Sequence, residues 1–254
     1  RKTAVIDRRY NQPALEAVCV GLAGADRAAL TRRLLPRLRR ALPAGHHLLT
    51  SDAAIALRAA VGLSPGIIVI SGTGSIAFGR DEHGRVLRAG GWGSIFDDVG
   101  SGFDLGRKAI AAALHDHDGR GPFTQLTVRI CETLKLPDIT EIVLHPPEPH
   151  RIASLFPLVL EAARRRDFVA QQLCEQAGRD LAELAVALLK RTGWLRRVAP
   201  VVCAGGVLRS SARIRRSFKA HLRRQAPAAR VLLLRHPPVE GALALAREVA
   251  GKPV

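Results

Sequence analysis

Methionine, aromatic residues and long apolar runs are scarce or absent in this 254-residue chain. No apolar run approaches the roughly 20 residues of a membrane-spanning helix, so we expect no membrane protein. Aromatic residues make up 4% of the chain, and a core must therefore be built from Ala, Val, Leu and Ile. No signal-peptide pattern opens the sequence. Because Met is absent throughout, we expect the natural N-terminus to lie upstream of Arg1.

The cysteines are few and widely separated, and no two of them form a CxxC pair. There are four, at Cys19, Cys131, Cys174 and Cys203. This spacing gives no support for a zinc or iron–sulfur site. Three of the four lie in apolar stretches, which is typical of reduced, buried thiols. We therefore expect a cytoplasmic protein with no metal held by a cysteine cluster.

Acidic residues are outnumbered, with 22 Asp and Glu against 39 Lys and Arg, a formal net charge of +17. Only six of the basic residues are Lys, and the many Arg alternate with apolar residues at helical spacing, as on solvated helix faces. The chain shows no stacking aromatic set and no fold signature of a nucleic-acid module. We expect no specific nucleic-acid partner. An anionic partner is the alternative, since this charge attracts any polyanion, nucleotides included.

The apolar pattern alternates between strands and helices. Strands are predicted over 17–22, 66–70 and 198–203, and the clearest helix over 168–191. Glycine-rich turns follow several of the strands. This arrangement predicts an α/β protein whose ligand sites lie where strands end.

The turn Gly72-Thr73-Gly74-Ser75 follows the second of these strands. Together with Ile76-Ala77 it fits the loose dinucleotide pattern G-x-G-x-x-A. That pattern needs a helix directly after the turn, whereas here another strand and a hairpin follow, so a Rossmann site is excluded. The glycines and hydroxyls can still form an anion nest for phosphate. A tight hairpin with no ligand explains the same residues equally well.

Three further features carry possible chemistry. Gly205-Gly206 lies between a strand and a helix, where a flat ligand could approach the backbone or where the glycines only serve packing. Trp92 stands between glycines with Asp98 nearby, a pair suited to a sugar ring and its hydroxyls, although a core-anchoring Trp is the alternative. Asp52 is either a functional carboxylate or a helix N-cap.

Taken in order, these features resemble one family. The matching segments, which span about 17–248, are Ser51-Asp52-Ala53-Ala54, IVISGTGSIAFGR, GGWGSIFDDVGSGFDLGRKAI, DGRGP, VVCAGGV and PVEGALALA. They resemble the N-acetylglucosamine kinases within the BadF/BadG/BcrA/BcrD ATPase family. The resemblance implies a two-lobed α/β fold of the actin/hexokinase-like (ribonuclease H-like) type. It also implies phosphorylation of N-acetylglucosamine at the 6-hydroxyl with ATP and Mg²⁺, and leaves a homodimer open.

The resemblance also implies roles for individual residues. Asp52 resembles the catalytic base. The donor-side residues are Gly72, Thr73, Gly74, Gly205, Gly206 and Ser210. The sugar-side residues are Ser75, Gly91, Trp92, Gly93 and Asp98. The implied domains are 1–64, with helix 238–250 packing back on it, and 65–237, which carries the phosphate, sugar and adenosine turns.

The sequence also departs from the family pattern. A DGGGT-type phosphate hairpin is missing before Ala17, so we expect a truncated chain with an incomplete first lobe. Four substitutions add to this: Ser94 stands where His is common, Asp97 where Gly is common, Val99 where Glu is common and Arg166 where Gly is common. The alternatives are therefore a glucosamine kinase or a catalytically inactive sugar- or nucleotide-binding remnant. Dehydratase-activator ATPases are disfavoured, because the dispersed cysteines do not suit their iron–sulfur cluster.

Overall fold

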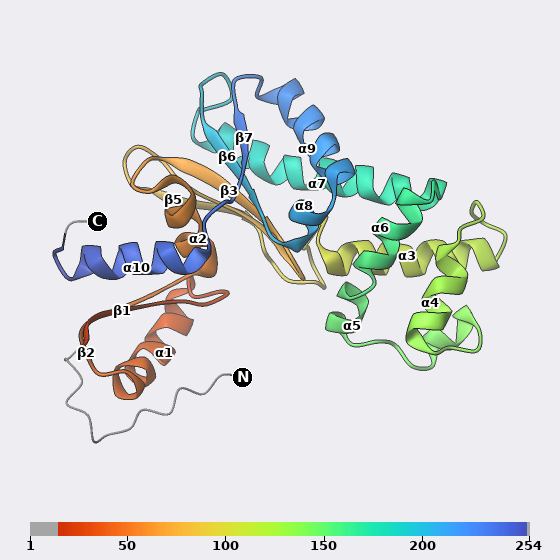
Figure 1. Ribbon diagram of the computed structural model, residues 1–254, viewed down its shortest axis with the longest axis horizontal. Coiled ribbons are helices and arrows are strands. Elements are labelled where there is room, and N and C mark those ends of the chain that lie inside the picture. The colour runs from red at the N-terminus through yellow and green to blue at the C-terminus, as the bar shows by residue number, and fades with distance from the viewer. Residues whose placement is uncertain (1–14, 253–254) are drawn as a thin grey trace. The chain divides into compact units, whose positions relative to one another are not determined.

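The computed structural model describes residues 15–252, which form two compact units (Figure 1). One contains the described residues up to 59 together with those from 236 onward, and the other is 60–235. The hairpin expected to be missing concerns residues 1–16, of which 1–14 lie outside the described residues. Within 15–252, no helix combines the length and apolarity needed to cross a membrane.

The first unit is built on a pair of parallel strands. Strands β1 (Leu15–Gly21) and β2 (Ala44–Thr50) are joined by helix α1 (Ala28–Ala41) and followed by α2 (Asp52–Val61). Helix α10 (Pro238–Val249) packs against both strands and approaches α2 closely, since a Cβ on Gly241 would lie 2.0 Å from the Ile55 carbonyl oxygen. The buried Arg58 guanidinium pairs with Glu248 at 3.1 Å, which ties α2 to α10.

A mixed five-stranded sheet organises the second unit. Its order is β5-β4-β3-β6-β7, where β3 is antiparallel to β4 and parallel to β6. The strands are β3 (Gly66–Ser71), β4 (Ser75–Arg80), β5 (Val86–Gly90), β6 (Pro200–Ala204) and β7 (Arg230–Leu233). Ile67, Ile68 and Val69 of the central strand are fully buried, which explains their continuous apolar run.

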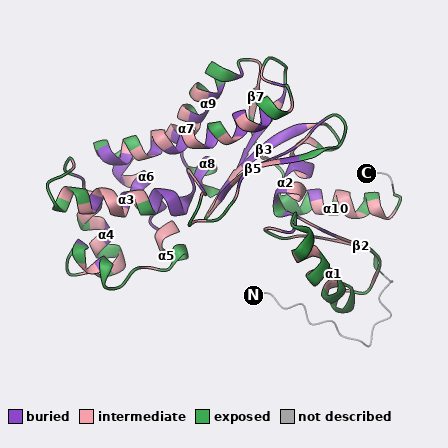
Figure 2. Cartoon of the chain, turned by 180° about the vertical axis from the view of Figure 1, so that it is seen from behind, coloured by how far each residue is buried: buried purple, intermediate pink, exposed green. Residues whose placement is uncertain are grey.

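The helices of this unit pack in part against the sheet and in part against one another. They are α3 (Gly102–His117), α4 (Leu126–Leu134), α5 (Pro149–Ala153), α6 (Phe156–Arg164), α7 (Phe168–Arg191), α8 (Gly206–Ser210) and α9 (Ala212–Gln225), with a short 3-10 helix η1 (Ile139–Val143). Helix α7 has the bounds predicted from the sequence and packs against β3, β4, β5 and α9. Figure 2 shows β3 and much of α7 as buried, and the core is largely Ala, Val, Leu and Ile, as the composition requires.

Two strand ends bring the glycine turns to the same edge of the sheet. Ile70 of β3 and Ala204 of β6 are register partners in the parallel pair. The turn after β3 leads into strand β4, so the exclusion of a dinucleotide-binding turn is confirmed. Gly205 has a φ of +88°, and a Cβ there would lie 2.1 Å from the Ser71 carbonyl oxygen. Only glycine fits this contact without displacing one of the two turns.

Gly205→Ala should therefore destabilise the protein, by about 1–3 kcal/mol from the backbone conformation alone and more from the clash with Ser71. Gly206→Ala is the matched control, because a Cβ at Gly206 meets no atom within 4 Å. We expect the control to change stability by less than about 1 kcal/mol. Urea unfolding of both variants measures this difference. Equal losses would show that the Gly205–Ser71 contact does not constrain the two turns.

Candidate active site

A cavity of about 370 Å³ lies where the two glycine turns meet. Its lining includes Gly72 and Thr73 of the first turn and Gly206 and Val207 of the second. The remaining lining residues are Gly102 at the start of α3 and His150, Ala153, Ser154 and Phe156 in and after α5. The structure thus brings the predicted phosphate turn and part of the predicted adenosine-side turn into one cavity, named here the donor pocket.

The first turn is held by hydrogen bonds to its carbonyl groups. The Gly102 N–H donates to the Gly72 carbonyl at 2.8 Å, and the Phe103 N–H donates to the Thr73 carbonyl at 3.2 Å. Because these N–H groups of α3 serve the turn, they are not free to bind an anion. Thr73 is exposed, and its hydroxyl forms no hydrogen bond within residues 15–252. That hydroxyl is therefore available to a phosphate oxygen.

Helix α5 and its C-cap residue add two polar side chains that sequence reasoning missed. These residues, His150 and Ser154, line the donor pocket but belong to no recognisable sequence motif. Their position depends on a close helix contact, since a Cβ on Gly106 of α3 would lie 2.0 Å from the Ile152 carbonyl oxygen. An imidazole N–H is a donor suited to phosphate oxygens, whereas the Ser154 hydroxyl already donates its proton to the Arg151 carbonyl at 2.7 Å. No pattern in the sequence around His150 signals this placement.

Asp98 connects the first turn to the loop of residues 91–98, named here the sugar loop because it carries four of the predicted sugar-side residues. Its Oδ1 accepts a hydrogen bond from the Ser75 N–H at 3.2 Å, and a Cβ on Gly74 would lie 2.8 Å from its Oδ2. The backbone of Asp98 is left-handed, with a φ of +61°, and the residue is 8% exposed. The pKa of the Asp98 carboxyl is raised, mainly by burial and further by the negative charges of Asp97 and Asp104. Hydrogen bonds from the N–H groups of Ser75 and Gly93 oppose this rise but do not cancel it.

Ser75 and Ser71 hold the segment that follows Asp98. The Ser75 hydroxyl donates to the Val99 carbonyl at 2.7 Å, and the Ser71 hydroxyl donates to the Gly100 carbonyl at 2.9 Å. Ser75 is buried, so its hydroxyl proton is engaged within the protein. A sugar contact by Ser75 remains a prediction, and it would have to use the lone pairs of the hydroxyl oxygen.

Trp92 is presented to solvent and is not part of the core. It is 60% exposed, whereas Trp194 is 3% exposed and donates its indole N–H to Glu82. The guanidinium of Arg88 lies 4.4 Å from the centre of the Trp92 ring and donates to the carbonyls of Gly90 and Gly91. The core-anchoring alternative for Trp92 is therefore wrong. Arg88, which the sequence analysis did not single out, fixes both the ring and the loop backbone.

The rest of the sugar loop is open and contains the departures from the family pattern. Gly91 and Gly93 have φ values of +71° and +95°, so the path of the loop requires glycine at both positions. Ile95 and Phe96 are 86% and 85% exposed. The Asp97 Oδ2 is buried and has no hydrogen-bond partner among the described residues.

Asp52 lies in the first compact unit, as the first residue of α2. The helix cap belongs to its neighbour, because the Ser51 hydroxyl oxygen accepts from the Ala54 N–H at 3.1 Å. Asp52 itself is exposed. Within residues 15–252, its carboxylate accepts one hydrogen bond, from the adjacent Ala53 N–H at 2.9 Å. The capping role that was the structural alternative for Asp52 is thus filled by Ser51.

Ser210, the last predicted donor-side residue, does not line the donor pocket. It lines a second cavity that also contains Arg166. The described part of the chain has no cluster of three or more His, Cys, Asp or Glu side chains placed to hold a metal. Mg²⁺ in phosphoryl-transfer sites is commonly bound by one or two carboxylates and by substrate phosphates.

The fold and these turns define an actin- and hexokinase-like α/β protein. A solved ROK hexokinase from Thermus thermophilus shares this fold, with a TM-score of 0.56 at 18% identity, over 92% of this chain and 78% of that one. Residues 3–246 match the BadF/BadG/BcrA/BcrD ATPase family. The chain belongs to this family.

Two relatives with higher identity are described as amino-sugar kinases. An N-acetylmuramic acid/N-acetylglucosamine kinase from Clostridium acetobutylicum is 34% identical over 235 residues, which cover 91% of this chain and 77% of the relative. A structure assigned as an N-acetylglucosamine kinase from Chromobacterium violaceum has a TM-score of 0.75 at 29% identity and covers 92% of this chain and 78% of that one. The protein is thus related to sugar kinases of a family that uses ATP.

The raised pKa of Asp98 predicts a specific pH dependence of stability. A carboxyl whose pKa is raised on folding contributes stability at low pH, and this contribution is lost as pH rises from the unfolded to the folded pKa. Asp98→Asn should abolish this pH-dependent part of the stability, because asparagine does not titrate. The variant should be at least as stable as wild type at pH 7, since its amide oxygen can still accept from the Ser75 N–H.

Thermal unfolding from pH 4 to 8 measures the difference between variant and wild type. Asp118→Asn is the control, because Asp118 is a surface carboxylate paired with Arg120. If the Asp98→Asn difference stays constant across this range, the pKa of the Asp98 carboxyl is not raised on folding.

Proposed function

We propose that the protein transfers the γ-phosphoryl group of ATP to the 6-hydroxyl of N-acetylglucosamine. The observation that carries this proposal is the arrangement in the second unit. One cavity joins the two glycine turns, and the carboxylate beside the first turn also belongs to the loop that presents Trp92. Family membership and the amino-sugar kinase relatives support the same conclusion.

On the donor side, the turn Gly72–Gly74 would contact the phosphates, with the exposed Thr73 hydroxyl as a donor. His150, which also lines the donor pocket, would donate to the same charged oxygens. Gly205 and Gly206 would lie along the nucleoside, with Ser210 beyond them. Mg²⁺, when bound with ATP, would neutralise charge on the phosphates.

On the acceptor side, the exposed face of Trp92 would pack against the apolar face of the sugar ring. Asp98 would accept hydrogen bonds from sugar hydroxyls. Gly91 and Gly93 would shape the loop, and Arg88 would hold the ring orientation through its contact at 4.4 Å. We assign the sugar, phosphate and adenosine turns to the unit of residues 60–235 and the base to the unit that contains Asp52.

Asp52 would act as the general base. A sugar hydroxyl is a poor nucleophile until its proton is removed, and a positioned carboxylate contributes about 10²–10⁴-fold to such a step. The proton passes from the 6-hydroxyl to Asp52 while the sugar oxygen bonds to the γ-phosphorus. The bond between that phosphorus and the bridging oxygen breaks, and ADP leaves.

N-acetylmuramic acid is the second candidate substrate. The Clostridium acetobutylicum relative is described as a kinase for both sugars. N-acetylmuramic acid differs from N-acetylglucosamine by a group that carries a carboxylate. Arg88 of β5 places a guanidinium cation against Trp92, and a guanidinium has the chemistry to meet that carboxylate. Glucosamine, which lacks the acetyl group, is the third candidate substrate.

A coupled ADP-release assay tests the proposal across N-acetylglucosamine, N-acetylmuramic acid, glucosamine, N-acetylmannosamine and glucose. We expect the highest kcat/KM with N-acetylglucosamine. Preference for N-acetylmuramic acid or for glucosamine would replace the proposed substrate with that sugar. Absence of turnover with every sugar, in protein that binds ATP, would favour an inactive binding protein.

Asp52→Asn separates a catalytic base from a structural residue. Asparagine preserves the size and the hydrogen bond to Ala53 but cannot take the proton, so we expect kcat to fall by about 10²–10⁴-fold with little change in melting temperature. Ser51→Ala should do the reverse, because it removes the helix cap, and cost about 1 kcal/mol of stability with kcat nearly unchanged. A kcat for Asp52→Asn close to that of wild type would refute the assignment.

A further inference from the structure

A buried carboxylate at the start of α3 links the chain that follows the sugar loop to helix α7. Asp104 lies in the first turn of α3 and is 4% exposed. Its Oδ2 accepts a hydrogen bond from the Gly100 N–H at 2.9 Å. The same oxygen receives the Lys108 ammonium at 2.7 Å, and that ammonium also pairs with Asp180 of α7 at 3.1 Å. We call Asp104, Lys108 and Asp180 the lysine bridge.

Gly100, two residues beyond the sugar loop, is the point where the lysine bridge meets the site. Its carbonyl accepts from the Ser71 hydroxyl at the end of β3, while its N–H donates to Asp104. Its φ is +69°, and a Cβ there would lie 2.7 Å from the Ala177 carbonyl oxygen of α7 and 2.7 Å from the Leu181 Cγ. Gly100 is therefore enclosed by contacts with β3, α3 and α7.

Lys108 keeps its charge although it is partly buried. Its side chain is 26% exposed, and burial alone would lower its pKa, but the carboxylates of Asp104 and Asp180 outweigh burial and raise the pKa. Arg107 gives Asp104 a second cation, at 3.0 Å from Oδ1, from a side chain that is exposed. Of these two cations, only Lys108 also pairs with a carboxylate of α7 among the described residues.

The α7 end of the lysine bridge is held by further side chains. The Asp180 Oδ1 accepts from the Gln176 amide N–H at 2.6 Å, and the Gln176 amide oxygen accepts from the Arg179 guanidinium at 2.7 Å. Both carboxylates of the lysine bridge are thus held by groups besides Lys108. The ammonium lies between two anions whose positions are already fixed by the two helices.

The first glycine turn has its own connection to α3. The N–H groups of Gly102 and Phe103 donate to the carbonyls of Gly72 and Thr73. These bonds use the backbone of α3 and do not depend on the lysine bridge. Loss of the lysine bridge should therefore loosen the chain that leads back from Gly100 to the sugar loop more than it loosens the first turn.

We propose that Lys108 is a positioning residue for the sugar loop. By holding Asp104 against α7, it fixes the Gly100 N–H and, through the short segment before it, the position of Asp98. This inference rests on the proposed function, because it concerns how the sugar is held for the phosphoryl transfer assigned above. A displacement of about 1 Å at such a site can cost about 10²-fold in rate, so an anchor outside the site has a measurable effect.

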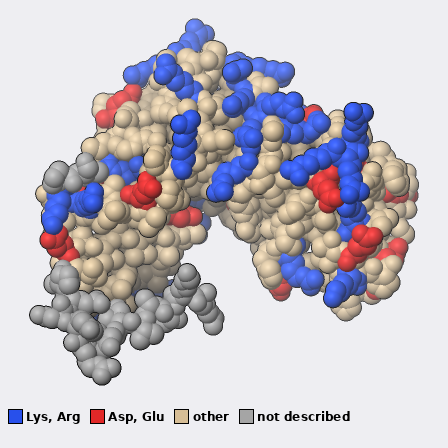
Figure 3. All heavy atoms as spheres, viewed as in Figure 1, with Lys and Arg blue, Asp and Glu red and all other residues tan. Residues whose placement is uncertain are grey.

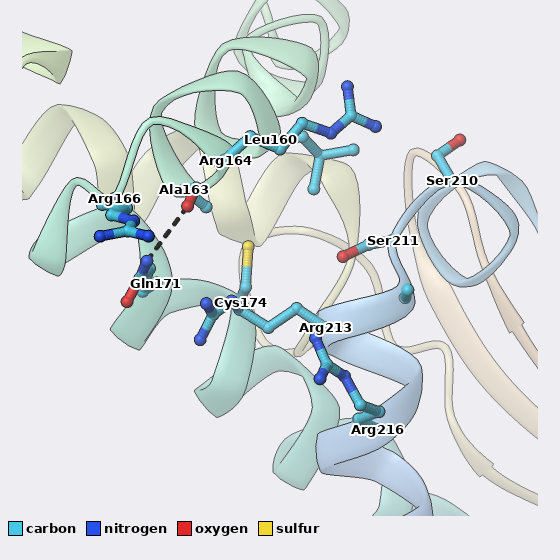
Figure 4. A pocket seen from close by; sticks show the side chains of 11 residues that line it. Leu160, Ala163, Arg164, Arg166, Gln171, Cys174, Ser210, Ser211, Arg213 and Arg216 are labelled. Atoms are coloured by element: carbon cyan, nitrogen blue, oxygen red, sulfur yellow. Dashed lines mark hydrogen bonds between the residues drawn. The ribbon is translucent and has the colours of Figure 1, made fainter.

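Basic side chains elsewhere in this unit serve as the comparison. Lys and Arg cover the surface around α9, as Figure 3 shows, and Arg213 and Arg216 line the cavity beside Ser210 (Figure 4). Arg129 is the matched control for Lys108. Its side chain is 22% exposed, its guanidinium pairs with Glu161 at 2.9 Å to join α4 to α6, and it lies outside the sugar loop and both glycine turns.

Steady-state kinetics with N-acetylglucosamine and ATP test the proposal. We expect Lys108→Met to raise the KM for the sugar and to lower kcat/KM for the sugar about 10- to 10²-fold, with the KM for ATP changed less than about threefold. Lys108→Arg, which retains a cation, should recover most of this loss. Arg129→Met should leave both KM values near those of wild type, because a loss of stability alone removes folded enzyme and lowers only the apparent kcat.

Amide hydrogen exchange provides a readout that does not depend on turnover. In Lys108→Met, a peptide that covers 94–104 should exchange faster than in wild type, whereas Arg129→Met should leave its exchange unchanged. Asp180→Asn removes only the charge at the α7 end and should shift the same peptide in the same direction, so it replaces Lys108→Met if that variant does not fold.

The two measurements separate this inference from the proposed function. If wild type phosphorylates no sugar, the proposed function fails, and the exchange comparison still decides whether Lys108 anchors the loop. Unchanged exchange of the 94–104 peptide in Lys108→Met and Asp180→Asn would overturn the inference. A fall in kcat with an unchanged sugar KM, or equal effects of Lys108→Met and Arg129→Met, would also overturn it.

Discussion

The contact between Gly205 and the Ser71 carbonyl is the constraint on which the site depends. The parallel pairing of β3 with β6 brings the two strand ends to one edge of the sheet, and the missing side chain at Gly205 lets the following turns approach each other. A cavity lined by Thr73 and Gly206 exists only because of this approach. Two segments separated by more than a hundred residues thus form one pocket through backbone contact.

Asp98 extends the same arrangement toward the sugar loop. Gly74 leaves room for its carboxylate, and the Ser75 N–H binds it, so movement of the phosphate turn and of the loop around Trp92 must be coupled. The serines on either side of the turn add two further bonds to the backbone around Gly100. We infer that donor and acceptor positions are set by one connected network, which suits a reaction that requires in-line geometry.

Much of the fold could be predicted from sequence because its signals are local. The apolar run of β3, the bounds of α7 and the strand after the GTGS turn all follow from periodicity and turn chemistry. The site of His150 could not be predicted, because it depends on the tertiary contact between α3 and α5. The Arg88 side chain contacts Gly90, Gly91 and Trp92, which are close in sequence, but no residue pattern signals that contact. The assignment of the helix cap to Ser51 rather than Asp52 likewise needed the backbone geometry of α2.

The most direct test of this account is a crystal structure with a non-hydrolysable ATP analogue and N-acetylglucosamine. The account predicts phosphates within hydrogen-bond distance of the Thr73 hydroxyl in the donor pocket. It also predicts a sugar ring against Trp92, with hydroxyls bonded to Asp98. Nucleotide phosphates bound away from the two glycine turns, or a sugar that contacts neither Trp92 nor Asp98, would contradict it.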